Sequence, residues 1–422
     1  MDKRENNLNE IEALKAELIE KKRIEDFLRS ENKNLWTYIN NIQKLPFFNV
    51  FILFSQKVKK IISTLRIVKE NEMPTANKNN TNGKSFPIGF GTTQKHLQVL
   101  FVIPNNKIEI GGIQTSVKLA EDLRFSGINV KIVSIVEDPS AVNNDLFLNK
   151  EGLNEIQSIN ILIVCGAESV NLSNELYKKF NSKRILLMQG PDHYFTPDWE
   201  NSKNFVSAIR NFELVVTISN FLNDLAKQIG AKNTKCVLLG FDDNIFKFNE
   251  SNRVRQIVIP CRSNIEKGLK ILLPQIPELR KKGWRVVGFG DLENPKTAEV
   301  FDKFYGRIDK LKIYEIFIES KILLDPSFME GLGLIPLEAA ASGVVPIISK
   351  RHSYDGLFNN GLIPFIEIDD FQIPEKVLSA IEKAEKLNPE KISKTVQDLN
   401  WANGSSNFVK VINQLLTNSL EI

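Results

Sequence analysis

From residue 97 onward, the apolar positions of the chain form short runs that alternate with stretches of helical spacing. Near-continuous apolar runs separated by helices are typical of parallel strands that are buried on both faces. We therefore expect one sheet of a doubly wound, Rossmann-like domain over residues 97–250. Its predicted strands are 96–104, 130–136, 159–164, 184–188, 214–218 and 236–239.

The same pattern starts again after residue 250, which predicts a second doubly wound domain over residues 251–422. The predicted architecture is α/β, with two Rossmann-like domains that face a cleft at the carboxyl ends of their strands. A last helical pattern over 407–420 has no fixed place, and packing back on the first domain is one option. The strands predicted for the second domain are 255–260, 285–289, 322–325 and 344–348.

Residues 1–45 predict a long helix in front of these domains. Residues 5–45 contain no Pro or Gly, and their apolar positions alternate at spacings of three and four. Polar residues, among them Lys21, Glu25 and Asn32, interrupt the apolar seam where a strict heptad places apolar side chains. The pattern favours a homo-oligomer assembled through a coiled coil of residues 5–45, and a solitary solvated helix is the alternative.

Residues 46–70 form a basic amphipathic segment, and residues 71–96 predict a flexible linker because they are polar and rich in Asn, with Pro and Gly. Between residues 44 and 69 there are Lys, Arg and several Phe but no Asp or Glu. Such a segment fits an anionic membrane surface. Packing of its aromatic side chains on a neighbouring domain or subunit is the alternative.

Composition and charge narrow the function classes. The 55 Lys and Arg residues against 51 Asp and Glu leave a net charge of +4, and 42% of the residues are hydrophobic. These values are ordinary for globular proteins and argue against a nucleic-acid binder or a wholly disordered chain. The 3 cysteines lie far apart, so we expect neither a disulfide framework nor a zinc cluster. No apolar run approaches the roughly 20 residues of a membrane span, and we expect a cytoplasmic protein.

Two glycines, Gly111 and Gly112, follow the first predicted strand and precede a helix predicted at 116–125. Glycine lets the backbone approach a ligand closely, and free amides at a helix start suit a phosphate or a polar sugar. An ordinary strand-to-helix turn explains the same residues. The third glycine of the dinucleotide-binding fingerprint is missing.

Two cations, Arg262 and Lys267, stand where the first strand of the second domain ends. Arg262 follows the strand and Lys267 begins the next predicted helix, so both side chains can reach the rim of the cleft. Paired cations there can neutralise a diphosphate without a metal ion. A solvated surface pair is the alternative.

The strongest signal lies after the third strand of the second domain, where Glu330 sits in a Gly-containing loop and Glu338 in a helix of small residues. Because side chains lean toward the start of a helix, Glu338 points back at the loop. The amides of Gly333, Leu334 and Ile335 are helix-start donors for a phosphate between two acids that can bind sugar hydroxyls. A purely structural interpretation makes Glu330 a cap and Glu338 an exposed acid.

The segment from Glu330 to Glu338 resembles the E-x7-E signature of the retaining, GT-B-fold glycosyltransferases of family 4. Arg262 and Lys267 resemble the family's phosphate-gripping pair, and the two glycines at 111–112 match as well. The resemblance also extends to 217–219, the strand-end Ser, and to 240–246, the segment that joins the two halves. It covers about residues 97–420 and leaves out the helical front.

The resemblance implies a nucleotide-diphospho-sugar donor held mainly by the second domain. Arg262 and Lys267 would bind its diphosphate, Glu338 the ribose hydroxyls, and Glu330 the donor sugar near the reacting carbon. The amides at Leu334 and Ile335 would hold phosphate, with Gly112 approaching from the first domain.

The reaction that the resemblance implies transfers the sugar with retained anomeric configuration. Positive charge near the departing phosphate would stabilise the leaving group. No Asp-x-Asp occurs in the sequence, which is consistent with a site that needs neither a metal nor another cofactor.

Two departures from the family's pattern concern the first domain and the base. Many members carry a catalytic His after the fourth strand, where this chain has Gln189, and His193 follows four residues later. We treat Gln189 and His193 as candidate acceptor or sugar contacts, and a plain loop histidine is the alternative. The stretch between Gly290 and Tyr305 is shorter than in the family, which leaves base recognition around Arg307 open.

The leading hypothesis is a retaining glycosyltransferase on the inner face of the cell membrane. It would move a sugar to a glycan or glycolipid acceptor in bacterial-type cell-surface polysaccharide synthesis. The alternatives are a catalytically degenerate nucleotide-sugar-binding scaffold and a GT-B epimerase or hydrolase. The dependence of product formation on an added acceptor distinguishes a transferase from an epimerase or hydrolase.

A chain that starts at Lys95 tests both expectations for the helical front. We expect light scattering to give fewer subunits than for the full chain, because the coiled coil is gone. We also expect the shortened chain to stay at the bottom of a flotation gradient with anionic liposomes, whereas the full chain rises. Equal subunit numbers would refute the coiled coil, and equal flotation would refute the membrane surface.

Overall fold

The computed structural model describes residues 96–107, 111–136, 145–191, 205, 207–358 and 364–417. The predicted coiled-coil helix (1–45), the basic segment (46–70) and the linker up to residue 95 lie outside the described residues. The described residues belong to one compact unit of the chain. None of their helices has the length and apolarity needed to cross a membrane.

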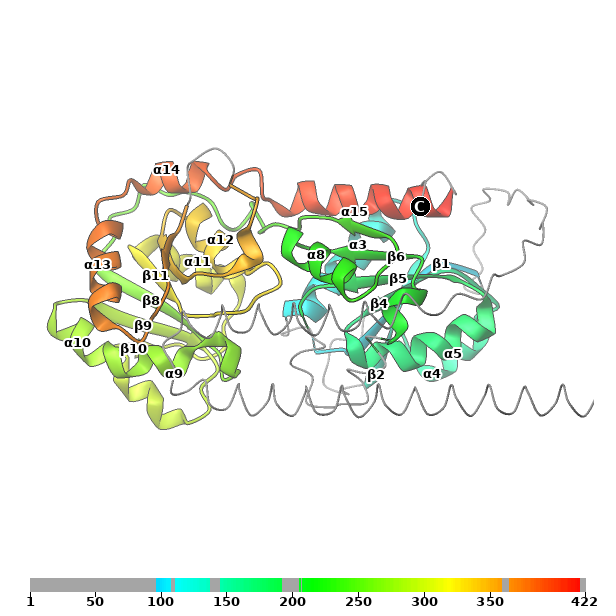
Figure 1. The fold of residues 1–422 in the computed structure, drawn as a ribbon, viewed down its shortest axis with the longest axis horizontal. Coiled ribbons are helices and arrows are strands. Elements are labelled where there is room, and N and C mark those ends of the chain that lie inside the picture. The colour runs from blue at the N-terminus through cyan, green and yellow to red at the C-terminus, as the bar shows by residue number, and fades with distance from the viewer. Residues whose placement is uncertain are drawn as a thin grey trace, which may run out of the picture. The chain divides into compact units, whose positions relative to one another are not determined.

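The first half of the described chain is built on a parallel sheet in the order β3-β2-β1-β4-β5-β6-β7 (Figure 1). The first strand, β1, lies inside the sheet. Successive strands are added on one side of β1 up to β3 and then on its other side from β4, as in doubly wound folds. The strands are β1 (His96–Asn105), β2 (Val130–Val136), β3 (Phe147–Leu148), β4 (Ser158–Cys165), β5 (Lys183–Met188), β6 (Leu214–Thr217) and β7 (Thr234–Cys236).

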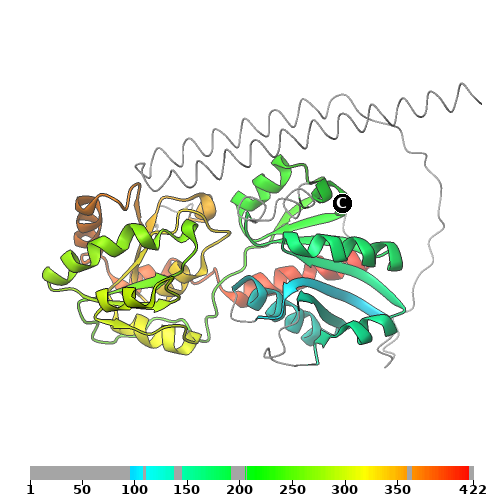
Figure 2. The same cartoon turned by 90° about the horizontal axis from the view of Figure 1, so that it is seen from below.

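Helices lie on both faces of this sheet (Figure 1 and Figure 2). They are α3 (Gly111–Phe125), α4 (Lys150–Glu155), α5 (Val170–Phe180) and α8 (Asn220–Gln228), with 3-10 turns η2 (Ala167–Ser169) and η3 (Ile209–Asn211).

The second half repeats the plan with a parallel sheet in the order β10-β9-β8-β11-β12-β13, which switches direction between β8 and β11. Its strands are β8 (Gln256–Cys261), β9 (Arg285–Gly290), β10 (Lys303–Phe304), β11 (Ile322–Asp325), β12 (Val345–Ser349) and β13 (Ile366–Ile368). Its helices are α9 (Leu269–Leu272), α10 (Ile276–Lys281), α11 (Lys310–Glu319), α12 (Leu334–Ala341), α13 (Pro374–Ala384) and α14 (Pro389–Lys394), with 3-10 turns η4 (Ile265–Lys267), η5 (Leu273–Gln275), η6 (Pro295–Val300) and η7 (His352–Tyr354).

Strand β1 shows why its sequence is almost continuously apolar. Val99, Phe101 and Ile103 belong to the larger hydrophobic cluster, whereas Leu100 and Val102 belong to a second cluster. Successive side chains of a strand point to opposite faces, so both faces of β1 must be apolar when helices cover both. Burying each of these larger side chains contributes about 1.5–3 kcal/mol.

Several helices begin at a residue whose side chain caps the first turn. The Ser219 hydroxyl accepts from the amide of Leu222 at the start of α8, and the Asp309 carboxylate accepts from the amide of Lys312 at the start of α11. Such caps satisfy donors that a helix start leaves unpaired, and each is worth about 1 kcal/mol.

The predicted fold class, two doubly wound parallel sheets with helices, is confirmed for the described residues. Three predicted boundaries were wrong: the helix predicted from 116 starts at Gly111, the helix predicted from 407 starts at Trp401, and the strand predicted at 236–239 already ends at Cys236. The edge strands β3, β10 and β13 were not predicted, because two or three residues are too few to form a hydrophobic pattern.

The last described helix, α15 (Trp401–Leu416), lies against α3 of the first half (Figure 1). Asp122 of α3 accepts hydrogen bonds from Trp401 Nε1 at 2.8 Å and from the Ser405 hydroxyl at 2.6 Å. Lys118, one turn earlier, lies 4.6 Å from the centre of a Trp401 ring and forms an ion pair with Asp242 at 2.7 Å. A few polar contacts therefore tie the end of the chain to the helix that carries Gly111 and Gly112.

Asp122→Ala tests this junction. We expect the free energy of unfolding to fall by about 2 kcal/mol, because two partly buried donors of α15 lose a charged acceptor. Urea unfolding followed by tryptophan fluorescence measures the change. The control is Asp145→Ala, which removes an exposed partner of Arg124 and should change little. Equal effects of the two substitutions would contradict a special role of Asp122.

Candidate active site

The candidate residues of the second half lie around the carboxyl ends of its central strands. Arg262 directly follows β8, and Glu330 stands in the loop after β11, the strand next to β8. In parallel sheets these strand ends share one edge, where ligands usually bind. The fold therefore brings together motifs that are almost seventy residues apart in the sequence.

Glu330 is held between the two predicted phosphate-binding cations. Its Oε2 lies 3.0 Å from Lys267 Nζ, and its Oε1 lies 3.4 Å from Arg262 Nη2. The side chain of Glu330 is only 10% exposed, and that of Lys267 16%. Burial alone would raise the pKa of Glu330, but the charges of Arg262, Lys267 and Arg351 outweigh it and hold the pKa at about 2. Glu330 is therefore ionised at any physiological pH.

A glycine explains how Lys267 comes so close to the loop. Gly268 has a φ of +65°, and a Cβ at this position would overlap the carbonyl oxygen of Pro326. The amide of Phe328 also donates to the carbonyl of Glu266 at 3.0 Å. The turn that carries Lys267 is thus packed directly on the loop that carries Glu330, and this packing requires glycine.

Glu338, the second predicted carboxylate, is buried in α12 and 3% exposed. Its Oε1 lies 3.3 Å from Lys310 Nζ, at the start of α11. The pKa of Glu338 is raised, because burial penalises its charge more than Lys310 compensates. Glu338 is therefore the less acidic of the two carboxylates, because the fold shifts the pKa of Glu338 upward and that of Glu330 downward.

The start of α12 provides the predicted amide donors. Gly333 is the N-cap with a φ of +82°, and no side chain caps the helix. Leu334 and Ile335 form the first turn, whose amide groups have no partner within the helix. Together with the positive end of the helix dipole, they make a place for an anion beside Glu330 and Lys267.

Three buried polar atoms in this region have no hydrogen-bond partner among the described residues: Glu330 Oε1, Arg262 Nε and Arg351 Nε. Buried polar atoms are normally satisfied. An acceptor and two donors that lack a hydrogen bond fit a site that takes a polar ligand.

In the first half, the structure brings Gln189 to the predicted glycine turn. Gln189 Nε2 donates to the carbonyl of Gly112 at 3.1 Å and to the hydroxyl of Ser116 at 2.9 Å. A Cβ at Gly331 would overlap the carbonyl oxygen of Gln189, so the loop of Glu330 also touches this residue. His193 lies outside the described residues, and its role stays a prediction.

Arg307 forms an ion pair with Asp291 at 2.6 Å, and its side chain is 65% exposed. It lies three residues before Lys310, the partner of Glu338. Lys310 was not predicted as a site residue, because a single Lys in the first turn of a helix is most simply interpreted as solvent-exposed. Nor were Arg351 and Tyr354, which follow β12 and have no motif of their own.

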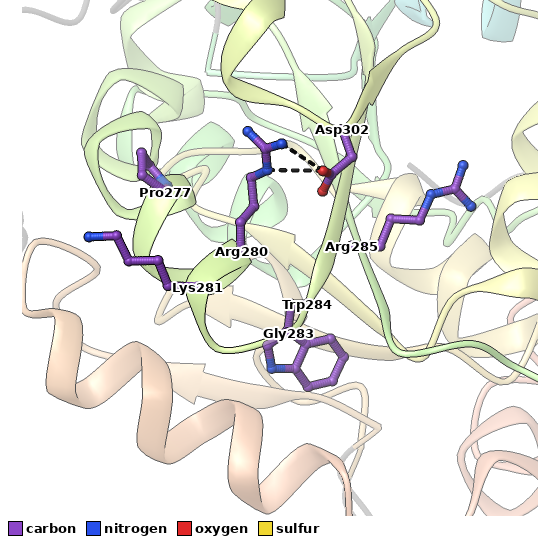
Figure 3. Close-up of a pocket in the computed structure, with 7 residues that line it drawn as sticks. All are labelled: Pro277, Arg280, Lys281, Gly283, Trp284, Arg285 and Asp302. Atoms are coloured by element: carbon purple, nitrogen blue, oxygen red, sulfur yellow. Dashed lines mark hydrogen bonds and ion pairs between the residues drawn. The ribbon is translucent and has the colours of Figure 1, made fainter.

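A hollow of about 680 Å³ elsewhere in the second half is not part of this site (Figure 3). Arg280 in it donates to Asp302 at 2.9 Å. The hollow includes Arg285, the first residue of β9, so it lies where the strands begin, whereas Arg262 follows the carboxyl end of β8. Its lining residues are Pro277, Arg280, Lys281, Gly283, Trp284, Arg285 and Asp302.

Within the described residues, no three His, Cys, Asp or Glu side chains gather in a way that could hold a metal ion. The chemistry that the site offers comes from its charges. Two cations and a row of helix-start amides can bind a diphosphate, and two carboxylates can accept hydrogen bonds from hydroxyl groups.

A comparison with protein families finds one match, which lies in the second half. Residues 255–382 match the family model described as Glycosyl transferases group 1. This range contains Arg262, Lys267, Glu330 and Glu338. No curated protein matches the chain significantly by sequence.

Solved structures share the fold at low sequence identity. Sucrose-phosphate synthase from Thermosynechococcus elongatus is 16% identical, with 76% of this chain and 100% of that chain covered and a TM-score of 0.62. HepE from Anabaena, solved in complex with UDP-glucose, is 16% identical, with 77% and 99% covered and a TM-score of 0.57. A glycosyltransferase from Rickettsia africae is 15% identical, with 76% and 99% covered and a TM-score of 0.56. The chain therefore has the GT-B fold of these proteins.

The acid stability of the protein should report the ionised Glu330. Because its pKa falls from the usual 4.5 to about 2 in the folded protein, ionised Glu330 stabilises the fold above about pH 4.5, and this stability is lost as the pH falls toward 2. We expect the unfolding free energy of Glu330→Gln to fall less than that of the wild type over this range, as measured by urea unfolding at several pH values.

Glu338→Gln is the matched control for this measurement. The raised pKa of Glu338 means that protonation of this carboxylate favours the folded state. Replacing Glu338 therefore cannot reduce the loss of stability between about pH 4.5 and pH 2. If both substitutions reduce the fall of the unfolding free energy at low pH equally, or neither does, the opposite pKa shifts of Glu330 and Glu338 are wrong.

Proposed function

We propose that the protein is a glycosyltransferase that moves a sugar from a nucleotide-diphospho-sugar to an acceptor hydroxyl. The observation that carries this proposal is Glu330, buried between Arg262 and Lys267 beside the start of α12. The match of residues 255–382 to the group 1 glycosyltransferases supports it.

Arg262, Lys267 and the amides of Leu334 and Ile335 would bind the diphosphate. In the described structure Glu330 holds both cations in place, so little rearrangement is needed when phosphate oxygens arrive. As the bond between the sugar carbon and the phosphate oxygen breaks, negative charge grows on the leaving diphosphate. Cations fixed beside that oxygen stabilise the transition state more than the bound substrate, which is what accelerates a reaction.

Glu338 would accept hydrogen bonds from the ribose hydroxyls, with Lys310 beside it. Glu330 Oε1 lies 3.4 Å from Arg262 Nη2 but has no hydrogen bond, and it would accept one from a hydroxyl of the donor sugar. In this arrangement the two carboxylates lie at the two ends of the diphosphate. HepE was solved with UDP-glucose, and a nucleotide-sugar donor of this kind fits the residues of this chain.

We further propose retention of the anomeric configuration without a metal ion. The acceptor oxygen bonds to the sugar carbon on the face that the diphosphate leaves, and the acceptor's proton passes to the departing phosphate. The spacing of Glu330 and Glu338 supports this, since it resembles the signature of retaining enzymes. Gln189, which contacts Gly112 and approaches Gly331, is suited to orient the acceptor or the sugar.

For the acceptor we propose a glycan or glycolipid used in building a cell-surface polysaccharide, with the protein attached peripherally to the inner membrane face. The support is the basic, Phe-rich sequence of residues 44–69. A lipid-linked acceptor would be met at such a surface.

Release of free nucleoside diphosphate tests the proposed activity. We expect turnover of one donor from a panel of UDP-, GDP-, dTDP- and ADP-sugars, in EDTA and with a mixture of glycolipid acceptors. Glu330→Gln and Lys267→Ala should each lower kcat by about 10²–10³, because both weaken the charge arrangement at the leaving group. Lys270→Ala is the matched control, since Lys270 is exposed and paired with Glu293.

Absence of both turnover and nucleotide-sugar binding by calorimetry would contradict the proposal and favour another role for the fold. Turnover that is lost in EDTA and restored by Mg²⁺ would contradict the metal-free mechanism alone. Hydrolysis at an unchanged rate without acceptor would indicate a hydrolase.

A further inference from the structure

A buried cluster of polar side chains, Asp325, Arg351 and Tyr354, contacts the loop of Glu330. The mechanism above gives these side chains no role. The Arg351 side chain is 1% exposed, and its Nη1 lies 3.1 Å from Asp325 Oδ2 and donates to the carbonyl of Ser327 at 3.1 Å. Arg351 Nη2 donates to the Tyr354 hydroxyl at 3.1 Å, and that hydroxyl donates to the carbonyl of Gly333 at 2.5 Å.

All the partners of this cluster belong to one segment. Asp325 ends β11, Ser327 opens the loop that carries Glu330, and Gly333 closes that loop as the N-cap of α12. Arg351 and Tyr354 thus hold the loop at both ends. Because the Tyr354 hydroxyl donates to the Gly333 carbonyl, this side chain contacts the N-cap of α12 directly.

Tyr354 itself is held firmly. Its ring stacks on Phe365, with ring centroids 4.6 Å apart, and packs at a tilt beside Phe358, with ring centroids 6.4 Å apart. A Cβ at Gly333 would come within 2.8 Å of the Tyr354 hydroxyl and 3.1 Å of Arg351 Nη2, so the backbone of Gly333 rests directly on both side chains. The position of the hydroxyl therefore determines the position of the N-cap.

The chemistry of the cluster argues for a role beyond stability. A buried ion pair loses its hydration, and apolar residues of similar volume at the same place are often at least as stable. The charge of Arg351 also acts on Glu330, whose pKa it helps to lower. A cation at this position therefore supports both the geometry of the loop and the ionised state of its carboxylate.

We propose that Arg351 and Tyr354 are positioning residues for the donor site: they fix the loop 325–333 so that the Glu330 carboxylate and the amides of Leu334 and Ile335 face the diphosphate together. This inference rests on the proposed function of the site. Neither residue touches the donor, and both act through Gly333, Ser327 and Asp325.

Tyr354→Phe is the sharpest test, because it removes one hydroxyl and leaves the aromatic stack. We expect amide hydrogen exchange at Leu337 and Glu338, the first amides that bond within α12, to become at least about tenfold faster, since the N-cap loses its anchor. We expect kcat/KM for the donor to fall by about tenfold, mainly through kcat, because helix-start donors matter most when charge develops on the phosphate.

Arg253→Lys is the matched control. Arg253 donates to the carbonyls of Phe317, Ser320 and Ser342, and Ser342 is the C-cap of the same helix α12. Its substitution disturbs the other end of α12 and should lower thermal stability without changing kcat/KM. A fall in kcat/KM for Tyr354→Phe that Arg253→Lys reproduces would overturn the positioning role and leave only a contribution to stability.

Variants at Arg351 provide a second series. Arg351→Lys keeps a charge near Glu330 but loses the fork that joins Asp325 and Tyr354, whereas Arg351→Met loses both. We expect kcat/KM to decrease in the order wild type, Lys variant, Met variant. Equal values for the Lys and Met variants would refute a role for the charge.

The two proposals fail in different ways. If the wild type neither binds nor turns over any donor, the proposed function fails, and hydrogen exchange at Leu337 and Glu338 still decides whether Tyr354 fixes the N-cap. If the wild type is active but exchange at these amides is the same in Tyr354→Phe, the positioning role fails alone.

Discussion

The candidate site depends on one interaction, the buried carboxylate of Glu330 between Lys267 and Arg262. The charges of Glu330 and Lys267 would be costly to bury alone, and each is tolerated because an opposite charge lies beside it. Arg262 and Lys267 come from the turn after β8, and Glu330 comes from the loop after β11. The ion pairs therefore join two neighbouring strand ends into one surface, on which the start of α12 and Glu338 complete the arrangement.

Glycines make this arrangement sterically possible. Gly268 lets the turn of Lys267 pack on Pro326, and Gly331 lets the loop of Glu330 pack on the carbonyl of Gln189. At Gly333 the positive φ starts α12 without a capping side chain, which leaves its first amides open. The site thus combines close backbone contacts, which any Cβ would prevent, with charged side chains that the fold brings together in ion pairs. Arg351 and Tyr354 bind the same loop through the carbonyls of Ser327 and Gly333.

Much of this could be predicted from local patterns. The apolar runs of β1, β2, β4 and β11 mark strands buried on both faces, and their alternation with helices leads to two doubly wound sheets. The short edge strands β3, β10 and β13 were not predicted. They are strands because they pair with a neighbouring strand, and their two or three residues form no pattern in the sequence. Likewise the helix start at Gly111 was missed, since glycine carries no helical signal of its own. For Arg262, Lys267, Glu330 and Glu338, the sequence spacing relative to strand ends was enough to predict that they face one edge.

What the sequence by itself determined is the fold class and the residue types at the strand ends, because both follow from periodicity and from chemistry within short segments. Only the tertiary structure decided which charges meet. Lys310 reaches Glu338, Arg351 reaches Asp325 and Ser327, and Tyr354 reaches Gly333, although no spacing connects the members of these pairs. The opposite pKa directions of Glu330 and Glu338 have the same origin. Burial and the distance to a counter-charge are properties of the packed fold, and two identical side chains eight residues apart differ only there.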